Sequence, residues 1–393
     1  MPHKAWETFL KFHHLIGITL VALAGAAFYL NHSLNYWNVV RKSMKEEKTT
    51  QCDYFSGRWV YDNVSYPIYN EEQCSFMDHI FACQKNGRKD FNYRYWRWQP
   101  RNCDIPRFNG KAFLEKIRGK KVLFVGDSVN RNQWVSLLCL IESSLAPSSK
   151  KSLTRKGNCN FFHSIEYNTT IGFYWSPFLV ESNCDDYLNH RNLDNRVIKI
   201  EAIEKHARHW NDADILIFDS YAWWLSPNKL LWGSFENRNA IYKKVETKTR
   251  PYEMGLRTWS DWLEMNINRT KTKLFFMSVS PNILRGDTFR HCYNKSEPIP
   301  KNLLPSKPYH LMGVLEASIE NLRARGINVE YLRITRMSEY RNDAHPSIYR
   351  ATIGHLSEDN KKDPTTYTDC LHWCLPGVPD IWNQILYDYI MKS

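Results

Sequence analysis

Short apolar runs alternate with longer amphipathic stretches over most of the chain after residue 119. Runs of this length and composition are typical of buried strands, and they fall at 121–125, 215–218, 274–277 and, more weakly, 329–333. Helical periodicity marks 128–143, 252–265, 311–325 and 380–391. Apolar strands that alternate with helices predict an α/β fold in which a mostly parallel central sheet is flanked by helices.

The segment 52–110 has a different pattern, with little periodicity and many Cys, Trp and Gly residues. It contains four of the cysteines and the aromatic stretch 96–100, which reads WRWQP. This composition predicts a loop-rich N-terminal module that is held together by disulfides. We therefore place a Cys/Trp-rich module at 52–110 and a catalytic domain at 111–393.

The first 51 residues are predicted to anchor the chain in a membrane. The run 15–30 is apolar and uncharged, and its neighbours extend it to 15–34, close to the roughly 20 residues that a bilayer span needs. A cleaved signal peptide is the alternative, because 22–27 is rich in small residues. We predict a retained signal-anchor at 15–34, with a cytoplasmic tail at 1–14 and a lumenal stem at 35–51. Basic residues lie on both sides of the span, so their distribution does not fix the orientation.

Cysteines and glycosylation sequons indicate the compartment. The chain has ten Cys, an even number, and no C-x-x-C pair of the kind that binds zinc, which favours disulfides over a metal site. The N-x-[ST] pattern predicts glycosylation at Asn63, Asn168, Asn268 and Asn294. Together these features predict that the chain lies on the lumenal side of the secretory pathway, and we expect no bound metal.

Charge and aromatic content narrow the class of partner. The net charge of +12 favours acidic partners, which include nucleic acid, anionic lipid and uronic-acid polysaccharide. Fifteen Trp and 22 Tyr suit the apolar faces of sugars, although most of these rings are expected in the core. The lumenal signals argue against nucleic acid.

The first candidate for chemistry is Gly126-Asp127-Ser128, which follows the apolar run 121–125 and opens a predicted helix. Ser128 would then lie at the carboxyl edge of the sheet, where α/β enzymes bind their ligands. The N-terminus of the helix would offer N–H groups to a developing oxyanion. A structural alternative is that Ser128 serves only as the N-cap of that helix.

The second candidate is the stretch 369–374, which reads DCLHWC. A serine needs a general base to become nucleophilic, and His372 is suited to that role. Asp369 precedes His372 by three residues, so both side chains would share one face of a helical turn, and the carboxylate would orient the imidazole. A surface Asp–His pair is the alternative, but the flanking Cys370 and Cys374 favour a rigid site. By contrast, we expect His206 and His209 to lie on a charged helical face and to bind no metal.

At this point the sequence resembles the plant trichome birefringence-like family of polysaccharide O-acetyltransferases. The resemblance runs from Cys52 to the end of the chain. In the N-terminal module it is carried by 52–60 (CDYFSGRWV), 83–90 (CQKNGRKD), 96–100 (WRWQP) and 103–108 (CDIPRF). In the catalytic domain it is carried by 126–134 (GDSVNRNQW) and 369–377 (DCLHWCLPG). These stretches are long, ungapped and rich in Trp and Cys, so the match is specific.

The resemblance implies an SGNH/GDSL-esterase-like fold and a triad of Ser128, His372 and Asp369. It also implies a type II Golgi membrane protein and four disulfides: Cys52–Cys103, Cys74–Cys139, Cys83–Cys374 and Cys292–Cys370. Cys159 and Cys184 have no counterpart in the family, and we predict that they pair with each other. For the oxyanion and substrate contacts we select Asn130, Arg131 and Asn183.

Three segments resemble the xylan-acetylating branch of the family: 173–183 (FYWSPFLVESN), 203–210 (IEKHARHW) and 338–347 (SEYRNDAHPS). The resemblance therefore implies transfer of acetyl to xylosyl hydroxyls through an acetyl-serine. The expected partners are xylan or a related polysaccharide, a membrane and an acetyl donor such as acetyl-CoA, with no bound cofactor. The alternatives are transfer to mannan, xyloglucan or pectin, a polysaccharide acetylesterase, and a wall-polysaccharide binding protein without catalytic activity.

Overall fold

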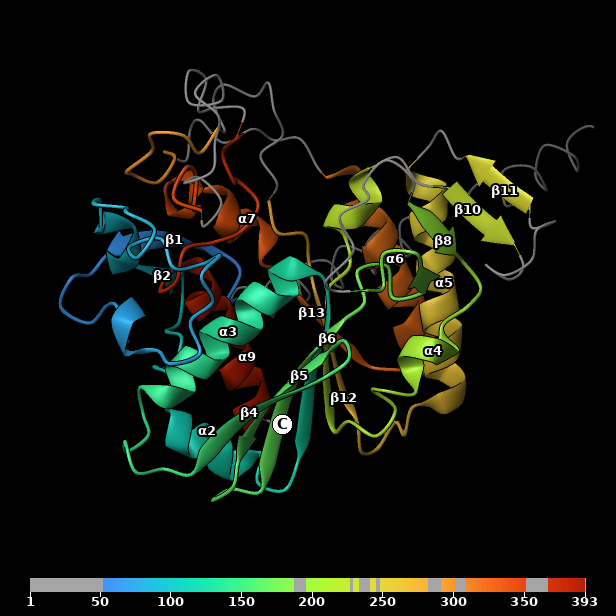
Figure 1. Cartoon of the computed structure of the whole chain (residues 1–393), viewed down its shortest axis with the longest axis horizontal. Helices are drawn as coiled ribbons and strands as arrows, with labels where there is room; N and C mark the ends of the chain where they lie inside the picture. The colour runs from blue at the N-terminus through green and yellow to red at the C-terminus, as the bar shows by residue number, and fades with distance from the viewer. Residues whose placement is uncertain are drawn as a thin grey trace, which may run out of the picture. The chain divides into compact units, whose positions relative to one another are not determined.

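The structure of the chain is a computed structural model (Figure 1). It describes residues 52–186, 196–226, 229–232, 241–244, 248–281, 291–300, 309–350 and 367–392. The chain divides into two units, Met1–Asp53 and Tyr54–Ser393, and the second is described here. The predicted anchor at 15–34, the tail and the stem lie outside the described residues. Within the described ranges, no helix combines the length and the apolar character that a bilayer crossing requires.

A seven-stranded sheet forms the centre of the second unit, in the order β13-β12-β9-β3-β6-β5-β4. All pairings from β13 to β6 are parallel, whereas β5 and β4 are antiparallel extensions at one edge. The strands are β3 (Lys121–Gly126), β4 (Lys151–Lys156), β5 (Cys159–Ser164), β6 (Thr169–Trp175), β9 (Ile215–Phe218), β12 (Lys273–Met277) and β13 (Val329–Leu332). The predicted fold class is thus confirmed, with a sheet that is mixed at one edge.

Helices cover both faces of this sheet (Figure 1). On one face lie α2 (Gly110–Lys116), α3 (Ser128–Glu142) and α9 (Val378–Lys392), and on the other lie α5 (Thr249–Asn266) and α6 (His310–Ala324). The alternation along β3 explains this arrangement, because Leu123 and Val125 join the hydrophobic core under α5 and α6 while their neighbours point the other way. On the face covered by α2, α3 and α9, Trp134 of α3 donates its indole N–H to the Ile171 carbonyl of β6 at 3.2 Å.

The predicted strands and helices of the parallel core agree with the observed elements to within about three residues at each end. The parallel strand β6 and the antiparallel strands β4 and β5 were not predicted. All but one residue of β4 are exposed, so this edge strand has no apolar alternation to reveal it. The prediction that His206 lies on a charged helical face is also wrong. This histidine is fully buried in α4 (Glu204–Ala207), where it meets the Tyr174 hydroxyl at 2.8 Å and Asp185 at 3.2 Å.

Smaller elements surround the core. A four-stranded sheet has the order β11-β10-β8-β7, made of β7 (Glu181–Ser182), β8 (Val197–Lys199), β10 (Lys229–Trp232) and β11 (Ile241–Lys244). In the N-terminal module, β1 (Gly57–Tyr61) and β2 (Trp96–Pro100) form an antiparallel pair. Short helical segments are η1 (Glu71–Gln73), η2 (Asn92–Tyr95), η4 (Ala222–Leu225), α7 (Thr335–Glu339) and η6 (Asn342–Ala344). Much of the module consists of turns, as its composition predicts.

Disulfides link these parts. The pairs Cys74–Cys139, Cys83–Cys374 and Cys292–Cys370 are those that the resemblance implied. Cys52 and Cys103 are also disulfide-bonded.

The predicted Cys159–Cys184 disulfide is wrong, because both residues are buried free thiols. Burial raises the pKa of each thiol to about 11, so both stay protonated and pack as small apolar side chains in the core. An even number of cysteines carries no information about the direction of each side chain, which decides whether a pair forms.

Candidate active site

Ser128 is placed by a sharp turn from β3 into α3. Asp127 caps the helix by accepting a hydrogen bond from the Val129 N–H at 2.8 Å, so Ser128 is not the N-cap. Gly126 is required in this turn, since a side-chain Cβ there would lie 2.3 Å from the carbonyl oxygen of Asp219 at the end of β9. The turn therefore presents Ser128 at the carboxyl edge of the sheet, as predicted.

The structure brings Ser128, His372 and Asp369 together in one hydrogen-bonded chain. Ser128 Oγ lies 2.7 Å from His372 Nε2, and His372 Nδ1 lies 2.7 Å from Asp369 Oδ2. Because an ionised carboxylate only accepts hydrogen bonds, Nδ1 carries the proton and Nε2 is left to accept the proton of Ser128. This is the geometry of an activated serine nucleophile.

Charge and burial tune the pair that orients the base. Burial alone would raise the pKa of Asp369, but His372 and the Leu371 and His372 N–H groups, at 3.1 and 3.0 Å, hold it well below its usual range. Burial alone would lower the pKa of His372, but the charge and hydrogen bond of Asp369 outweigh burial and raise it. The side chain of His372 is 16% exposed and that of Asp369 is 11% exposed, so the pair borders solvent without being open to it.

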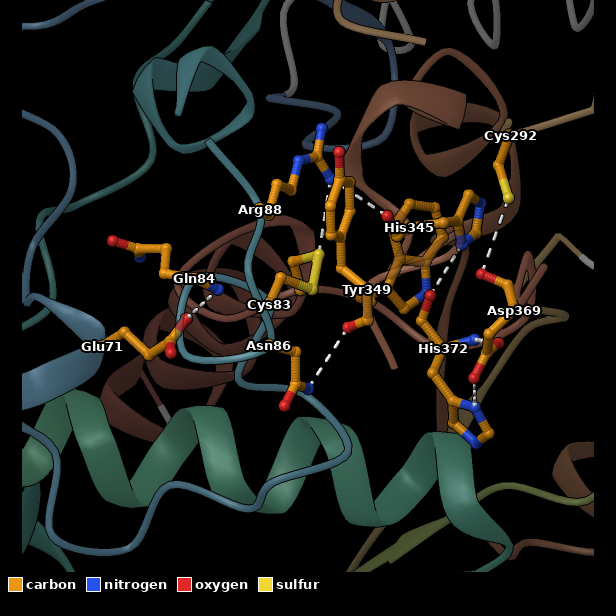
Figure 2. Close-up of a disulfide and its surroundings, with 12 residues drawn as sticks. Glu71, Cys83, Gln84, Asn86, Arg88, Cys292, His345, Tyr349, Asp369 and His372 are labelled. Carbon is orange, nitrogen blue, oxygen red and sulfur yellow. Dashed lines mark hydrogen bonds and ion pairs between the residues drawn. A yellow bond between two sulfur atoms is a disulfide. The ribbon is translucent and has the colours of Figure 1, made fainter. Parts of the chain in front are cut away.

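The segment 369–375, which carries His372, has no helix or regular strand and is held by distant parts of the chain. Disulfides attach Cys370 to Cys292 and Cys374 to Cys83, so a covalent bond lies within two residues of His372 on each side. Asp369 and Ser347 also exchange two backbone hydrogen bonds of 2.9 Å. Figure 2 shows the Cys83 disulfide, His345, Asp369 and His372 as one cluster.

The N-terminal module supplies a second group of contacts to this segment. Arg88 is almost fully buried and donates to the His345 carbonyl at 3.0 Å (Figure 2). It also donates to the Asp343 carbonyl at 2.7 Å. The Phe81 carbonyl accepts from the Leu375 N–H at 3.1 Å, and the Phe81 ring lies 5.8 Å from the His372 ring. The module is therefore part of the wall around the base.

Asn132, one turn after Ser128 on α3, connects the nucleophile to the base. Its amide accepts from the Trp373 N–H at 2.7 Å and donates to the Trp373 carbonyl at 3.2 Å. From the other side, His345 Nδ1 donates to the His372 carbonyl at 2.7 Å while its ring stacks on Trp373 at 4.0 Å. Burial lowers the pKa of His345 to about 4, so it is a neutral, structural histidine. These contacts fix the backbone on both sides of the His372 side chain.

Two further carboxyl groups lie at the same edge of the sheet. Asp127 and Asp219 are both buried at the ends of the neighbouring strands β3 and β9. Burial raises the pKa of Asp127 to about 6, and burial with the charge of Asp127 raises the pKa of Asp219 well above its usual range. Burial therefore favours the protonated form of both carboxyl groups, and the charge of Asp127 adds to this effect at Asp219.

The three residues selected for oxyanion contacts have different surroundings. The Asn130 amide is fully buried, and neither of its polar atoms has a partner in the described part of the chain. Arg131 forms an ion pair with Asp78 of the module. Asn183 accepts from the Val197 N–H at 2.8 Å, next to β8. The role of these three residues in oxyanion or substrate binding stays a prediction. Across the described ranges, no cluster of His, Cys, Asp and Glu side chains is arranged to hold a metal ion.

Sequence reasoning did not identify Phe81, Arg88, Asn132 and His345. Asn132 had a usable signal, since it lies four residues after Ser128 and so on the same helical face. The other three act across large sequence separations, for example 257 residues between Arg88 and His345, and no local pattern reveals such contacts.

Two family profiles together match residues 50–389 of this chain. The profile of the GDSL/SGNH-like acyl-esterase family found in Pmr5 and Cas1p, called PC-Esterase, matches residues 105–389, and that of the PMR5 N terminal domain matches residues 50–104. Protein trichome birefringence-like 34 of Arabidopsis thaliana is 45% identical over 97% of this chain and 96% of its own length. Xylan O-acetyltransferase 14 of Oryza sativa subsp. japonica is 44% identical over 87% of this chain and 78% of its own. Xylan O-acetyltransferase 13 of the same plant is 45% identical over 87% and 70%.

Proposed function

This chain belongs to the trichome birefringence-like family with its PC-Esterase domain, and we propose that it is a xylan O-acetyltransferase that uses Ser128, His372 and Asp369. The observation that carries the chemistry is the hydrogen-bonded chain of 2.7 and 2.7 Å from Asp369 through His372 to Ser128. The names of the relatives support xylan as the acceptor.

The proposed reaction is a double displacement. His372 takes the proton of Ser128 as its oxygen attacks the acetyl carbonyl of the donor, and the tetrahedral intermediate expels the leaving group, which receives that proton. The product is an acetyl-serine. A xylosyl hydroxyl then attacks the acetyl carbon, gives its proton to His372, and Ser128 regains a proton as it leaves.

The helix terminus supports the oxyanion of both steps. Within the described ranges the Ser128 N–H has no acceptor, and it lies at the positive end of α3. The acetyl donor is proposed to be an acetyl thioester such as acetyl-CoA. The enzyme itself would hold no cofactor.

The proposal is tested by mass spectrometry of xylo-oligosaccharides incubated with the purified chain and an acetyl donor. Products heavier by one acetyl are expected from the wild type and not from Ser128→Ala. Ser143→Ala, at the far end of α3, is the matched control and should keep the activity. Transfer that survives in Ser128→Ala would overturn the mechanism. Products only on mannan, xyloglucan or pectin would change the acceptor, and release of free acetate alone would make the protein an esterase.

We further propose that the protein is a single-pass Golgi membrane protein with its catalytic domain in the lumen. The four sequon asparagines are all exposed, which supports glycosylation at Asn63, Asn168, Asn268 and Asn294. Protease protection of the tagged C-terminus in Golgi vesicles, with loss of mass after glycosidase treatment, is the expected result. Digestion of the C-terminus in intact vesicles would contradict the orientation.

A further inference from the structure

A cavity of about 610 Å³ lies away from the triad, between the β1–β2 pair, the segment 297–300 and Tyr340. We propose that it is a second polysaccharide-binding site, which holds a uronic-acid-bearing stretch of the acceptor chain. The identity of the polysaccharide rests on the proposed function, whereas the presence of a sugar site does not. The volume is within the range of ligand sites, which is about 300–1,000 Å³.

Aromatic rings line this cavity, and one of them is held rigidly. Trp59 donates its indole N–H to the Met337 carbonyl at 2.7 Å, and the Arg341 guanidinium lies 4.6 Å from its ring centre. Arg341 is fully buried, so it covers the protein side of the ring, while Trp59 itself is only partly buried. The open side of a fixed ring is a suitable surface for the apolar face of a sugar, because little conformational entropy is lost on binding.

The β-pairing extends this surface. In the register of β1 and β2, Trp59 is opposite Trp98 and Tyr61 is opposite Trp96. The ring centres of the two pairs are 5.6 and 5.4 Å apart, and Trp98 lies 6.3 Å from Tyr340. Trp98 is buried and packs against Trp59 from the protein side, so the accessible rings on this face of the strand pair are Trp59, Tyr61 and Trp96. Several accessible rings on one face suit consecutive sugar rings better than a single small molecule.

Charge at the rim indicates the acidic class of ligand. Arg58 and Arg101 line the cavity and are exposed, and in the described part of the chain neither guanidinium has an ion-pair partner. Glu297 also lines the cavity and offers an acceptor for sugar hydroxyls. Two unpaired guanidinium groups beside aromatic rings fit a carboxylate on a sugar chain, since Arg binds carboxylates in a bidentate manner.

The test measures binding by calorimetry with the full-length chain carrying Ser128→Ala, because this variant leaves the ligand unmodified. The probes are a xylohexaose and the same hexaose bearing one glucuronic acid. The double variant Arg58→Ala/Arg101→Ala should weaken binding of the acidic probe by about tenfold or more and leave the neutral probe nearly unchanged. Trp96→Ala should weaken both probes, because its indole N–H makes no hydrogen bond in the described part of the chain and the truncation removes mainly stacking.

Arg155→Ala, at an exposed arginine of β4, is the matched control and should bind both probes like the parent. Melting temperatures of all variants separate loss of binding from loss of folding. Unchanged affinity for both probes in the folded Arg58→Ala/Arg101→Ala and Trp96→Ala chains would overturn the site. Binding of a proline-rich peptide or of polyphosphate, without binding of either oligosaccharide, would also overturn the site.

An activity measurement distinguishes this site from the proposed function. With Ser128 intact, the cavity variants should raise KM for polymeric glucuronoxylan and leave kcat on xylotriose unchanged. A wild-type chain that binds the oligosaccharides but transfers no acetyl group would refute the proposed function and keep the site. Normal transfer with unaltered KM and affinity in the variants would keep the function and refute the site.

Discussion

The two sides of the triad reach the same point by different physical means. The nucleophile arm, residues 121–142, is a strand, a tight turn and a helix, and its main determinants are within a few residues of Ser128. The base arm, residues 369–375, has no regular element and is held by Cys83, Cys292, His345 and Asn132. One arm is therefore a property of local sequence and the other a property of the whole tertiary structure.

This difference gives the N-terminal module a catalytic consequence. The Cys83–Cys374 bond spans 291 residues, and Arg88 and Phe81 add noncovalent contacts beside it. A module that only bound polysaccharide would not need to contact the base arm so closely. We infer that the module positions His372 in addition to any role in binding.

The largest effect is expected within the base arm itself. Asp369→Asn keeps an acceptor for the N–H groups of Leu371 and His372 but presents an amide to His372 Nδ1, which favours the wrong tautomer. We expect kcat to fall about 10³–10⁴-fold with little change in melting temperature, since triad members act as a unit. Steady-state kinetics with thermal melts test this. A loss below about tenfold would show that the carboxylate does not orient the base.

Removing one disulfide from each arm tests the comparison directly. Cys74–Cys139 joins the module to α3 of the nucleophile arm, and Cys83–Cys374 joins it to the base arm. Loss of either bond should cost about 2–5 kcal/mol of unfolding free energy. We expect kcat of the folded fraction to fall about 10²-fold only for Cys83→Ala/Cys374→Ala, because a shift of His372 by about 1 Å is enough for that loss.

The measurement is denaturant unfolding together with kcat per folded molecule. Cys74→Ala/Cys139→Ala is the matched control, and its kcat should stay near that of the wild type. Equal losses of kcat in the two double variants would mean that both arms depend on the module in the same way.

The same contrast explains how much could be predicted from the sequence. The strand 121–126, the helix 128–142 and the placement of Ser128 follow from an apolar run, a glycine and helical periodicity, which are all local. The pairing of Asp369 with His372 is also local. The disulfides came from a family resemblance, and where that resemblance was silent the predicted Cys159–Cys184 bond was wrong.

The burial of Arg88 and the edge strand β4 could not be predicted from the sequence. Arg88 reads as one more basic residue in a charged stretch, and only the fold shows that it is buried against the His345 carbonyl. The edge strand β4 is almost wholly exposed, so its sequence contains no buried face to detect. For Arg88 the cause is a partner that lies far away in the sequence. For β4, whose partner β5 follows almost directly, the cause is the absence of a buried face.

A smaller effect is expected from the direct link between the arms. Asn132→Ala removes both hydrogen bonds to Trp373, and Asn383→Ala removes the amide donor to the Gln133 carbonyl and the Ser136 hydroxyl on the same helix. Both asparagines are fully buried, so each variant should lose about 1–3 kcal/mol of stability. Only Asn132→Ala should lower kcat, by about tenfold, with KM little changed. Equal kcat values at equal stability would show that Asn132 is merely structural.

The smallest effect is expected from removing the negative charge of Asp127, which belongs to the nucleophile arm and lies near His372. His372 accepts a proton only when it is neutral. Burial lowers its folded-state pKa, but Asp369 outweighs burial and Asp127 adds to that effect, so the pKa lies above the ordinary value of 6.5. Activity should therefore be lost as pH falls through a value above 6.5. Asp127→Asn keeps an N-cap that accepts from Val129 but removes the charge, so the acidic limb of kcat/KM should move to lower pH by less than about one unit. Asp62→Asn, a carboxylate of the module that pairs with Arg97, is the control and should leave the limb in place. An acidic limb that moves upward in Asp127→Asn would mean that the two arms are coupled through the conformation of the turn and not through charge.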